Sequence, residues 1–247
     1  AENLRQNFER IGVLRRAAGS IAGRLAAVHD GLAEETAAAG REPGSVRLVL
    51  VSKNAGVAEI LEAYEAGHRD FGENYVKAAG EKMRALEERG AGGIRWHMVG
   101  QLQSNKAAWV ARNFDLLHSL ATASAAAAVN KAMAAEGRHG QALVQVRLGG
   151  GSARGGVEPE SAVSFASEVA ALGNIRLCGV MGVAPAGQDA RPHFCRLRGV
   201  LEEVRGLGLP NAPLGEMSAG MSGDFRDAIR EGATVVRLGQ AVFGKQP

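Results

Sequence analysis

Apolar residues recur at the spacing of an amphipathic helix over the first forty residues of the chain. Successive members of the series lie three, four or seven positions apart, which is the spacing of one helix face. The series consists of Leu4, Phe8, Ile11, Leu14, Ile21, Leu25, Val28 and Leu32. The pattern predicts one or two long helices that end at Gly40, shortly before Pro43.

Beyond this segment, short β-rich runs alternate with helical patterns. The runs cover 46–52, 70–73, 95–100, 116–120, 142–148, 176–183, 213–218 and 234–238. The helical patterns cover 57–66, 75–89, 104–112, 122–136, 159–172, 190–207 and 222–231. Strands that alternate with helices predict an α/β protein with a parallel sheet. Eight strands and seven intervening helices predict a single (β/α)8 barrel of the TIM type, formed by one domain over 1–247.

The end of the chain leaves the eighth strand without a following helix. Only the residues AVFGKQP remain after that strand. We expect the N-terminal helical segment, residues 1–40, to pack on the barrel in place of the C-terminal eighth helix. An open, doubly wound sheet is the alternative architecture.

Composition narrows the class of protein. The chain has 247 residues, of which 46% are hydrophobic, enough to bury a full core. The net charge of +3 is spread along the chain, and no basic run is interleaved with aromatic residues, so we expect no binding to nucleic acid. No apolar stretch approaches the length of a membrane span, and the N-terminus AENLRQNFERIG has no apolar signal core. We therefore expect a cytoplasmic protein that does not bind membranes.

The two cysteines, Cys178 and Cys195, form no CxxC motif and no metal pattern. Cys178 lies in an apolar run, which predicts a buried free thiol. Unpaired thiols suit a reducing compartment, in agreement with the expected cytoplasmic location.

The first predicted strand ends in a lysine. Residues 47–56 read RLVLVSKNAG, with Lys53 at the tip of the strand. Active sites of such barrels lie at the C-terminal ends of the strands, so Lys53 would face the mouth of the barrel. A solvated lysine at a strand end is one interpretation. The other is a partly desolvated amine that acts as a nucleophile and forms a Schiff base.

Two glycine-containing segments, 217–225 (MSAGMSGDF) and 237–244 (RLGQAVFG), follow the seventh and eighth strands. Loops at these positions of a barrel often bind phosphate. Ser218 offers a hydroxyl group, and Gly220 and Gly239 allow close approach of the backbone to a ligand. Each glycine by itself could also simply form a turn.

A helix that begins at Ser222 or Gly223 would point its free N–H groups at an anion. An aldehyde-reactive Lys53 and a phosphate site in one barrel mouth suggest pyridoxal phosphate (PLP). Arg237, at the end of the eighth strand, could then reach the pyridine nitrogen.

Six segments carry a family resemblance. VSKNAG, DFGENYV, WHMVGQLQSNK, MGVAP, MSAGMSGDF and VRLGQAVFG occur in this order. Together they resemble the YggS/PROSC family, the pyridoxal phosphate homeostasis proteins, from about residue 3 to the C-terminus. The resemblance implies a barrel like the N-terminal half of alanine racemase that binds PLP covalently. It implies a role in intracellular PLP homeostasis, with effects on amino-acid and keto-acid balance and no established catalytic reaction.

The resemblance also implies site residues. Lys53 is the Schiff-base lysine, Arg237 falls at the ring-nitrogen position, and Asn74, at the end of the second strand, is a neighbour of the cofactor. The phosphate-binding segments contain Ser218, Gly220, Gly239 and Gln240. Apo PLP enzymes would be the acceptors of the cofactor.

This sequence departs from the family pattern at several positions. A threonine or serine usually stands where Gln240 stands, so a hydroxyl contact to phosphate is lost and a backbone N–H remains. Asn, Glu and Lys are usual at Arg147, Gly151 and Arg154, which makes the 147–156 loop after the fifth strand atypical. MSAGMS also replaces the usual LSMGMS.

The third strand and its loop leave two interpretations open. One of Trp96 and His97 should face the barrel interior, and His97 could be a hydrogen-bonded structural histidine or a catalytic one. The polar residues of 101–106 could bind an anion or only cap the following helix. They are Gln101, Gln103, Asn105 and Lys106.

A PLP-dependent racemase is the alternative function. An arginine at the pyridine nitrogen does not readily give up a proton, so the ring would be a weaker electron sink. In racemases the second base is a tyrosine from a second domain, whereas Tyr64 and Tyr75 lie in or beside predicted helices and we expect no further domain after Pro247. These features favour a monomeric PLP carrier over a racemase. A Schiff-base aldolase without cofactor is a third candidate.

Overall fold

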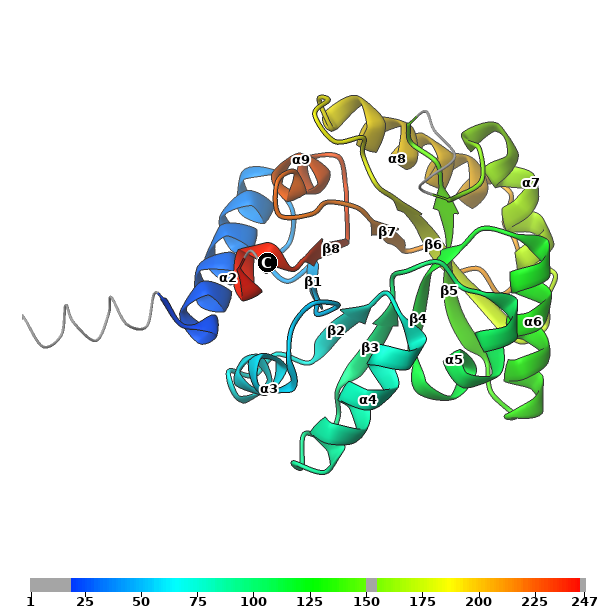
Figure 1. Ribbon diagram of the computed structural model, residues 1–247. Helices are drawn as coiled ribbons and strands as arrows, with labels where there is room; N and C mark the ends of the chain where they lie inside the picture. The colour runs from blue at the N-terminus through cyan, green and yellow to red at the C-terminus, as the bar shows by residue number, and fades with distance from the viewer. Residues whose placement is uncertain (1–18, 150–154, 245–247) are drawn as a thin grey trace, which may run out of the picture.

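Eight parallel strands close into a barrel in the order β1 to β8 (Figure 1). The computed structural model of the protein describes residues 19–149 and 155–244. The strands are β1 Arg47–Val51, β2 Asp70–Glu73, β3 Arg95–Met98, β4 Leu116–Leu120, β5 Gly140–Val146, β6 Ile175–Gly182, β7 Glu216–Ser218 and β8 Val235–Leu238. Parallel pairing of β1 with β8 closes the cylinder. The predicted TIM-type barrel is confirmed, and the open sheet is wrong.

Helices alternate with the strands on the outside of the barrel (Figure 1). They are α2 Ile21–Ala38, α3 Val57–Glu65, α4 Val76–Glu87, α5 Ala107–Asn113, α6 Ala123–Ala135, α7 Pro159–Ala170, α8 Arg191–Gly206, α9 Phe225–Arg230 and α10 Gln240–Phe243, with a 3₁₀ turn η1 at Ser104–Lys106. The helices α2 to α9 follow the predicted patterns closely, whereas the short α10 was not predicted. The main differences are that 104–112 begins as the 3₁₀ turn and that α9 is shorter than predicted.

The N-terminal helix covers the junction of β8 and β1. In Figure 1, α2 (blue) lies beside α9 and the short C-terminal helix α10 (red), and it also contacts α3. Arg24 Nε donates a hydrogen bond to the Val242 carbonyl at 2.5 Å, and buried Glu35 pairs with Arg226 at 3.2 Å. This helix takes the place of the eighth helix, as expected. The first half of the apolar series, within 1–18, lies outside the described residues.

The hydrophobic core lies between the strands and the surrounding helices. Phe71, Phe114 and Phe194 are among its largest fully buried side chains. A small separate cluster on β4, β5 and β6 contains Leu116, Leu143, Cys178 and Met181. Cys178 is a buried free thiol, as predicted, and burial raises the pKa of this thiol.

Another part of the barrel interior is filled by polar side chains. His118 on β4 lies within hydrogen-bond distance of Ser218 on β7, and these strands are not neighbours in the sheet. Their contact therefore crosses the barrel interior. Five polar side chains from β2, β3, β4, β7 and β8 meet there: Asp70, His97, His118, Ser218 and Arg237.

Among the described residues, no helix combines the length and the apolar character that crossing a membrane requires. The same residues contain no group of three or more His, Cys, Asp or Glu side chains arranged to hold a metal ion.

Candidate functional site

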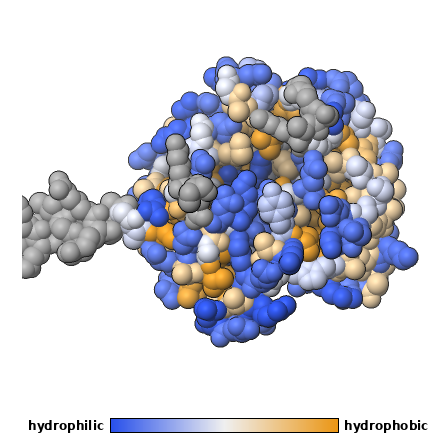
Figure 2. Space-filling model, in the orientation of Figure 1, coloured by the Kyte–Doolittle hydropathy of each residue, from blue (hydrophilic) through white to orange (hydrophobic). Residues whose placement is uncertain are grey.

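A cavity of about 540 Å³ opens at the C-terminal ends of the strands. This volume lies within the range of about 300–1,000 Å³ that is typical of small-molecule sites. Segments after β1, β2, β3, β6, β7 and β8 line it. Figure 2 shows hydrophilic residues gathered in the middle of one face of the molecule. Its polar lining residues include Lys53, Asn74, Ser222, Arg237 and Gln240.

Lys53 lines this cavity from a turn. β1 ends at Val51, where its pairing with Gly72 of β2 ends, so Lys53 stands two residues beyond the strand. Hydrogen bonds from the Ser52 N–H to Gly72 and from the Ala55 N–H to Ser52, both 2.9 Å, fix the backbone on either side. The side chain is exposed, not partly buried as one interpretation of the sequence required. Its amine is accessible to a ligand.

A second lysine supports the Lys53 turn from below. Lys82 Nζ donates to the Ser52 carbonyl at 2.6 Å, to Glu73 Oε1 at 2.8 Å and, at a longer 3.4 Å, to the Lys53 carbonyl. The Ser52 hydroxyl donates to the same Glu73 oxygen at 2.7 Å. Glu73 is fully buried, so this charge pair is shielded from solvent.

Sequence reasoning missed Lys82, although a signal was present. The buried residues of α4 include Ala79 and Leu86, and Lys82 follows Ala79 by three positions and precedes Leu86 by four. A lysine at this spacing lies on the buried face of the helix. Such a lysine needs a carboxylate partner, which Glu73 provides.

Arg237 is a buried cation that lines the cavity. It is 5% exposed and donates from Nη1 to Ser218 Oγ at 2.5 Å and from Nη2 to the Gly182 carbonyl at 3.0 Å. Burial lowers the pKa of Arg237 to about 10, and the charge of Asp224 opposes this shift. The guanidinium therefore stays positive at neutral pH, and no carboxylate of the described chain pairs with it.

Two of the residues predicted to bind phosphate do not line the cavity. Ser218 is fully buried, with Oγ 2.8 Å from His118 Nδ1, so its hydroxyl belongs to the barrel interior. Gly220 has a φ of +91°, and a Cβ atom there would come within 2.8 Å of the Phe225 Cα atom. Its glycine is therefore explained by the turn into α9.

The neighbouring segment brings free backbone N–H groups to the cavity. Ser222, Gly223 and Gln240 line the cavity, and their backbone N–H groups donate to no acceptor in the described part of the chain. Gly239 lies between β8 and α10, and a Cβ atom there would come 2.8 Å from the Val51 carbonyl oxygen. Free N–H groups around a residue that only glycine fits form a concave site suited to phosphate oxygens. The expectation that a helix begins at Ser222 or Gly223 is wrong, because α9 begins at Phe225 and these N–H groups belong to the turn before it. Ser222 lines the cavity, whereas Ser218 does not.

Asn74 follows the last residue of β2 and lines the cavity as expected. Its Oδ1 atom is buried and has no hydrogen-bond partner among the described residues. An unpaired amide oxygen at a cavity wall is costly in the free protein and is a ready contact for a polar ligand group.

The remaining sequence candidates lie away from this cavity. His97 is buried and hydrogen-bonded to Asp70 and His118, which favours the structural interpretation. Gln101, Gln103, Asn105 and Lys106 are exposed and do not line the cavity, and Gln103 makes no side-chain cap for the η1 turn. Neither interpretation of that segment gains support.

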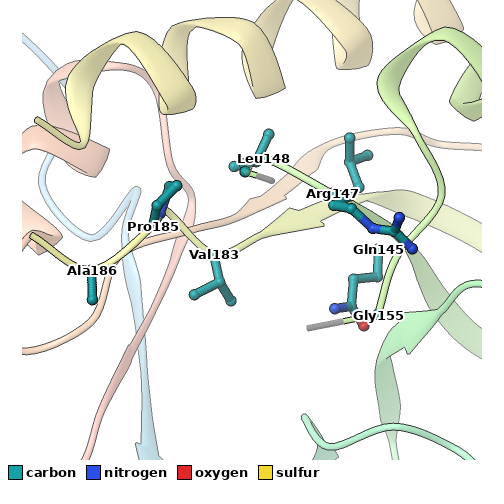
Figure 3. A pocket seen from close by; sticks show the side chains of 9 residues that line it. Gln145, Arg147, Leu148, Gly155, Val183, Pro185 and Ala186 are labelled. Carbon is teal, nitrogen blue, oxygen red and sulfur yellow. The ribbon is translucent and has the colours of Figure 1, made fainter. Parts of the chain in front are cut away.

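A smaller pocket of about 130 Å³ lies beside the loop after β5 (Figure 3). It shares Val183 with the main cavity. Arg147 bonds to Glu158 at 2.6 Å and to the Gly156 carbonyl at 3.1 Å, which joins the two ends of the loop. Gly151 and Arg154 lie outside the described residues.

Comparisons with known proteins agree on one family. The family model "Alanine racemase, N-terminal domain" matches residues 25–247. The pyridoxal phosphate homeostasis protein of Escherichia coli K12 is 36% identical over 225 residues, which are 91% of this chain and 96% of the relative.

Two solved structures are similar in fold and sequence. A protein of unknown function from Bifidobacterium adolescentis has a TM-score of 0.84 and 33% identity, with 92% of this chain and 96% of that chain covered. PipY of Synechococcus elongatus, solved with PLP bound, has a TM-score of 0.80 and 34% identity, with 91% of this chain and 100% of that chain covered.

Proposed function

We propose that this chain, which belongs to the family of pyridoxal phosphate homeostasis proteins, holds PLP in the cavity at the C-terminal ends of the strands. The observation that carries the proposal is the meeting of Lys53, Arg237 and the 222–223 and 239–240 segments around that one cavity. These groups come from β1, β7 and β8, and each matches one part of the cofactor. PipY, whose structure contains PLP, supports the proposal by its similarity.

The residues present fit this cofactor. The amine of Lys53 would form the covalent link, and the N–H groups of Ser222, Gly223 and Gln240 would donate to the phosphate. Arg237 would donate to the pyridine nitrogen, and Asn74 would contact a polar substituent of the ring. Ser218 and Gly220 do not line the cavity, so they would support the residues that do and would not contact the cofactor.

We further propose that the protein is a carrier and not an enzyme. PLP supplies a reactive aldehyde and an electron-withdrawing ring when it is bound. Arg237 is an obligate donor at neutral pH, so it would keep the ring nitrogen unprotonated and weaken the electron sink. Sequestration has a chemical purpose, because a free aldehyde modifies amines of other proteins. Apo PLP enzymes would be the acceptors.

A borohydride experiment tests the binding site. The purified protein is mixed with PLP, reduced with borohydride and digested for mass spectrometry. We expect a reduced adduct on Lys53 and a PLP absorption band that Lys53→Ala loses. The fold should be retained, because the side chain is exposed. Lys131→Ala, on the exposed side of α6, is the matched control and should keep both signals. An adduct at another lysine in the Lys53→Ala variant would refute the assignment.

A second experiment separates the carrier from a racemase. The PLP-loaded protein is incubated with single L-amino acids in deuterium oxide. Unchanged α-protons support the carrier, whereas exchange with turnover supports an enzyme. Cleavage or condensation products without PLP would indicate the aldolase. The cytoplasmic location, the monomeric state and the single-domain organisation stay predictions.

A further inference from the structure

Five buried side chains form a continuous hydrogen-bond chain through the barrel interior. Asp70 Oδ1 lies 2.9 Å from His97 Nε2, and His97 Nδ1 lies 3.0 Å from His118 Nε2. His118 Nδ1 lies 2.8 Å from Ser218 Oγ, which accepts from Arg237 at 2.5 Å. All five residues are at most 5% exposed. The chain thus runs from the first residue of β2 to the arginine that lines the cavity.

The two ends of this chain have fixed roles. Arg237 can only donate hydrogen bonds. Burial by itself would raise the pKa of the Asp70 carboxyl, but hydrogen bonds from Arg95 and His97 outweigh it and hold this pKa well below its usual range. Asp70 is therefore ionised and can only accept. The bidentate ion pair with Arg95 keeps the carboxylate in place.

These ends determine the direction of every bond when both histidines are neutral. His97 donates from Nε2 to Asp70, which makes its Nδ1 an acceptor. His118 must then donate from Nε2 to His97, which makes its own Nδ1 an acceptor for the hydroxyl of Ser218. Burial, and the neighbouring His97 and Arg237, hold the pKa of His118 well below its ordinary value of 6.5, in keeping with a neutral ring.

The opposite direction leaves a polar hydrogen unpaired. It requires His97 to carry hydrogens on both nitrogens and His118 to donate from Nδ1 to Ser218. The Ser218 oxygen would then accept from His118 and Arg237 together. Its own hydrogen would have no acceptor in the described part of the chain, at a cost of about 1–3 kcal/mol for a buried group.

We propose that Asp70, His97 and His118 are positioning residues for Arg237, which they hold at the cavity through a hydrogen-bond chain that runs in one direction from the guanidinium to Asp70. None of the three lines the cavity. In this hydrogen-bond chain the hydroxyl group of Ser218 donates its hydrogen to His118, so it has none left to donate to a ligand. The part of the proposal that concerns PLP rests on the proposed function, whereas the direction of the chain is a property of the free protein.

Nuclear magnetic resonance of the ligand-free, ¹⁵N-labelled protein at neutral pH tests the direction. Long-range ¹H–¹⁵N correlations report which imidazole nitrogen carries the hydrogen, and His97→Gln and His118→Gln spectra assign the two rings. We expect neutral rings protonated at Nε2 for both. A doubly protonated His97, or His118 protonated at Nδ1, would overturn the proposal. This measurement needs no ligand, and the two variants serve only to assign the rings of the unsubstituted protein.

Three variants test the positioning role. His118→Leu removes the acceptor of Ser218 and should weaken PLP binding about tenfold, which is about 1.4 kcal/mol, and shift the absorption of the bound cofactor. His118→Gln can donate to His97 and accept from Ser218, so it should restore most of the affinity. His68→Gln replaces a buried histidine that contacts the Asp70 carbonyl outside the chain, and it should bind PLP normally.

The outcomes separate the two proposals. Unchanged PLP affinity and spectrum in a folded His118→Leu protein would overturn the positioning role. An equal loss of PLP affinity in His118→Leu and His118→Gln would also overturn it, because restoring the hydrogen bonds of His118 would then have no effect on binding. Expected tautomers in a protein that fails to bind PLP would refute the proposed function and leave the direction of the chain intact.

Discussion

Lys82 Nζ lies 2.8 Å from Glu73 Oε1, and this pair joins α4 to the end of β2 directly beneath the turn that carries Lys53. The lysine side chain is 13% exposed and the glutamate side chain 0%. The Ser52 and Lys53 carbonyls accept from the same ammonium group. Lys82 therefore fixes the backbone of Lys53, the lysine that would bind PLP covalently in the proposed function.

Lys82→Met is expected to destabilise the protein by about 3 kcal/mol, because it leaves the buried Glu73 carboxylate without its cation. It should also weaken PLP binding, since the Lys53 turn loses its support. Urea unfolding and PLP titration measure the two effects. Lys77→Met, on an exposed position of the same helix, is the control. The double variant Glu73→Gln, Lys82→Met should recover part of the stability; no recovery would contradict the pairing argument.

Arg237→Ala is expected to weaken PLP binding less than Lys53→Ala, because the covalent link remains while the ring contact is lost. The absorption spectrum of the bound cofactor should change as well. Stability should fall by about 1–3 kcal/mol, because Ser218 and the Gly182 carbonyl lose their donor. Arg176→Ala, an exposed arginine on β6, should alter neither binding nor spectrum. Retained affinity with an unchanged spectrum would argue against the ring contact.

Acid should destabilise the fold through His68. Burial lowers the pKa of His68 to about 4, against backbone hydrogen bonding to Asp70, which raises it. In the unfolded chain His68 takes up a proton near pH 6.5, whereas in the folded chain it does not. The contribution of neutral His68 to the free energy of unfolding is therefore complete above pH 6.5 and is lost as the pH falls toward 4. A difference of about 2.5 in pKa corresponds to about 3 kcal/mol.

Urea unfolding between pH 7.5 and pH 4 measures this loss. His68→Gln keeps an N–H donor for the Asp70 carbonyl and does not titrate, so its stability should depend less on pH over the same range. Equal pH dependence in the two proteins would show that the loss arises elsewhere, for example from His118, whose pKa burial also lowers.

Gly239→Ala is expected to disturb the cavity, because the added Cβ atom would come 2.8 Å from the Val51 carbonyl oxygen. Relief of this contact must move β8 or β1, at a cost of about 1–3 kcal/mol, and should weaken phosphate binding. Gly223→Ala is the matched comparison, since its Cβ atom would meet nothing within 4 Å on the same cavity wall. Calorimetry with inorganic phosphate and thermal unfolding measure both variants. Equal stability of the two would contradict the argument.

Local pattern was sufficient to predict the elements of this fold. Each of the eight strands was visible as a short β-rich run and the helices between them as a helical spacing, because strands buried on both faces need apolar residues throughout and helices buried on one face need them at intervals of three to four. Lys53 and Arg237 could be placed at one face of the barrel from the sequence, because Lys53 follows β1, Arg237 lies near the end of β8, and the ends of parallel strands in a barrel meet at one face.

The choice between Ser218 and Ser222 could not be made from sequence. The two serines lie four residues apart, and both were candidates for an anion site. β7 ends at Ser218, whose side chain points into the barrel toward His118, while the following turn brings Ser222 to the cavity. Which of the two hydroxyl groups reaches the cavity therefore depends on the residue at which the three-residue strand β7 ends.

The sequence by itself determined the elements, their order and the lysine after the first strand, because these follow from patterns among residues close in sequence. Only the tertiary structure decided the partners inside the cylinder. His118 and Ser218 are 100 positions apart and become neighbours because strands on different parts of the ring face each other across its axis. No local periodicity encodes a contact of that kind.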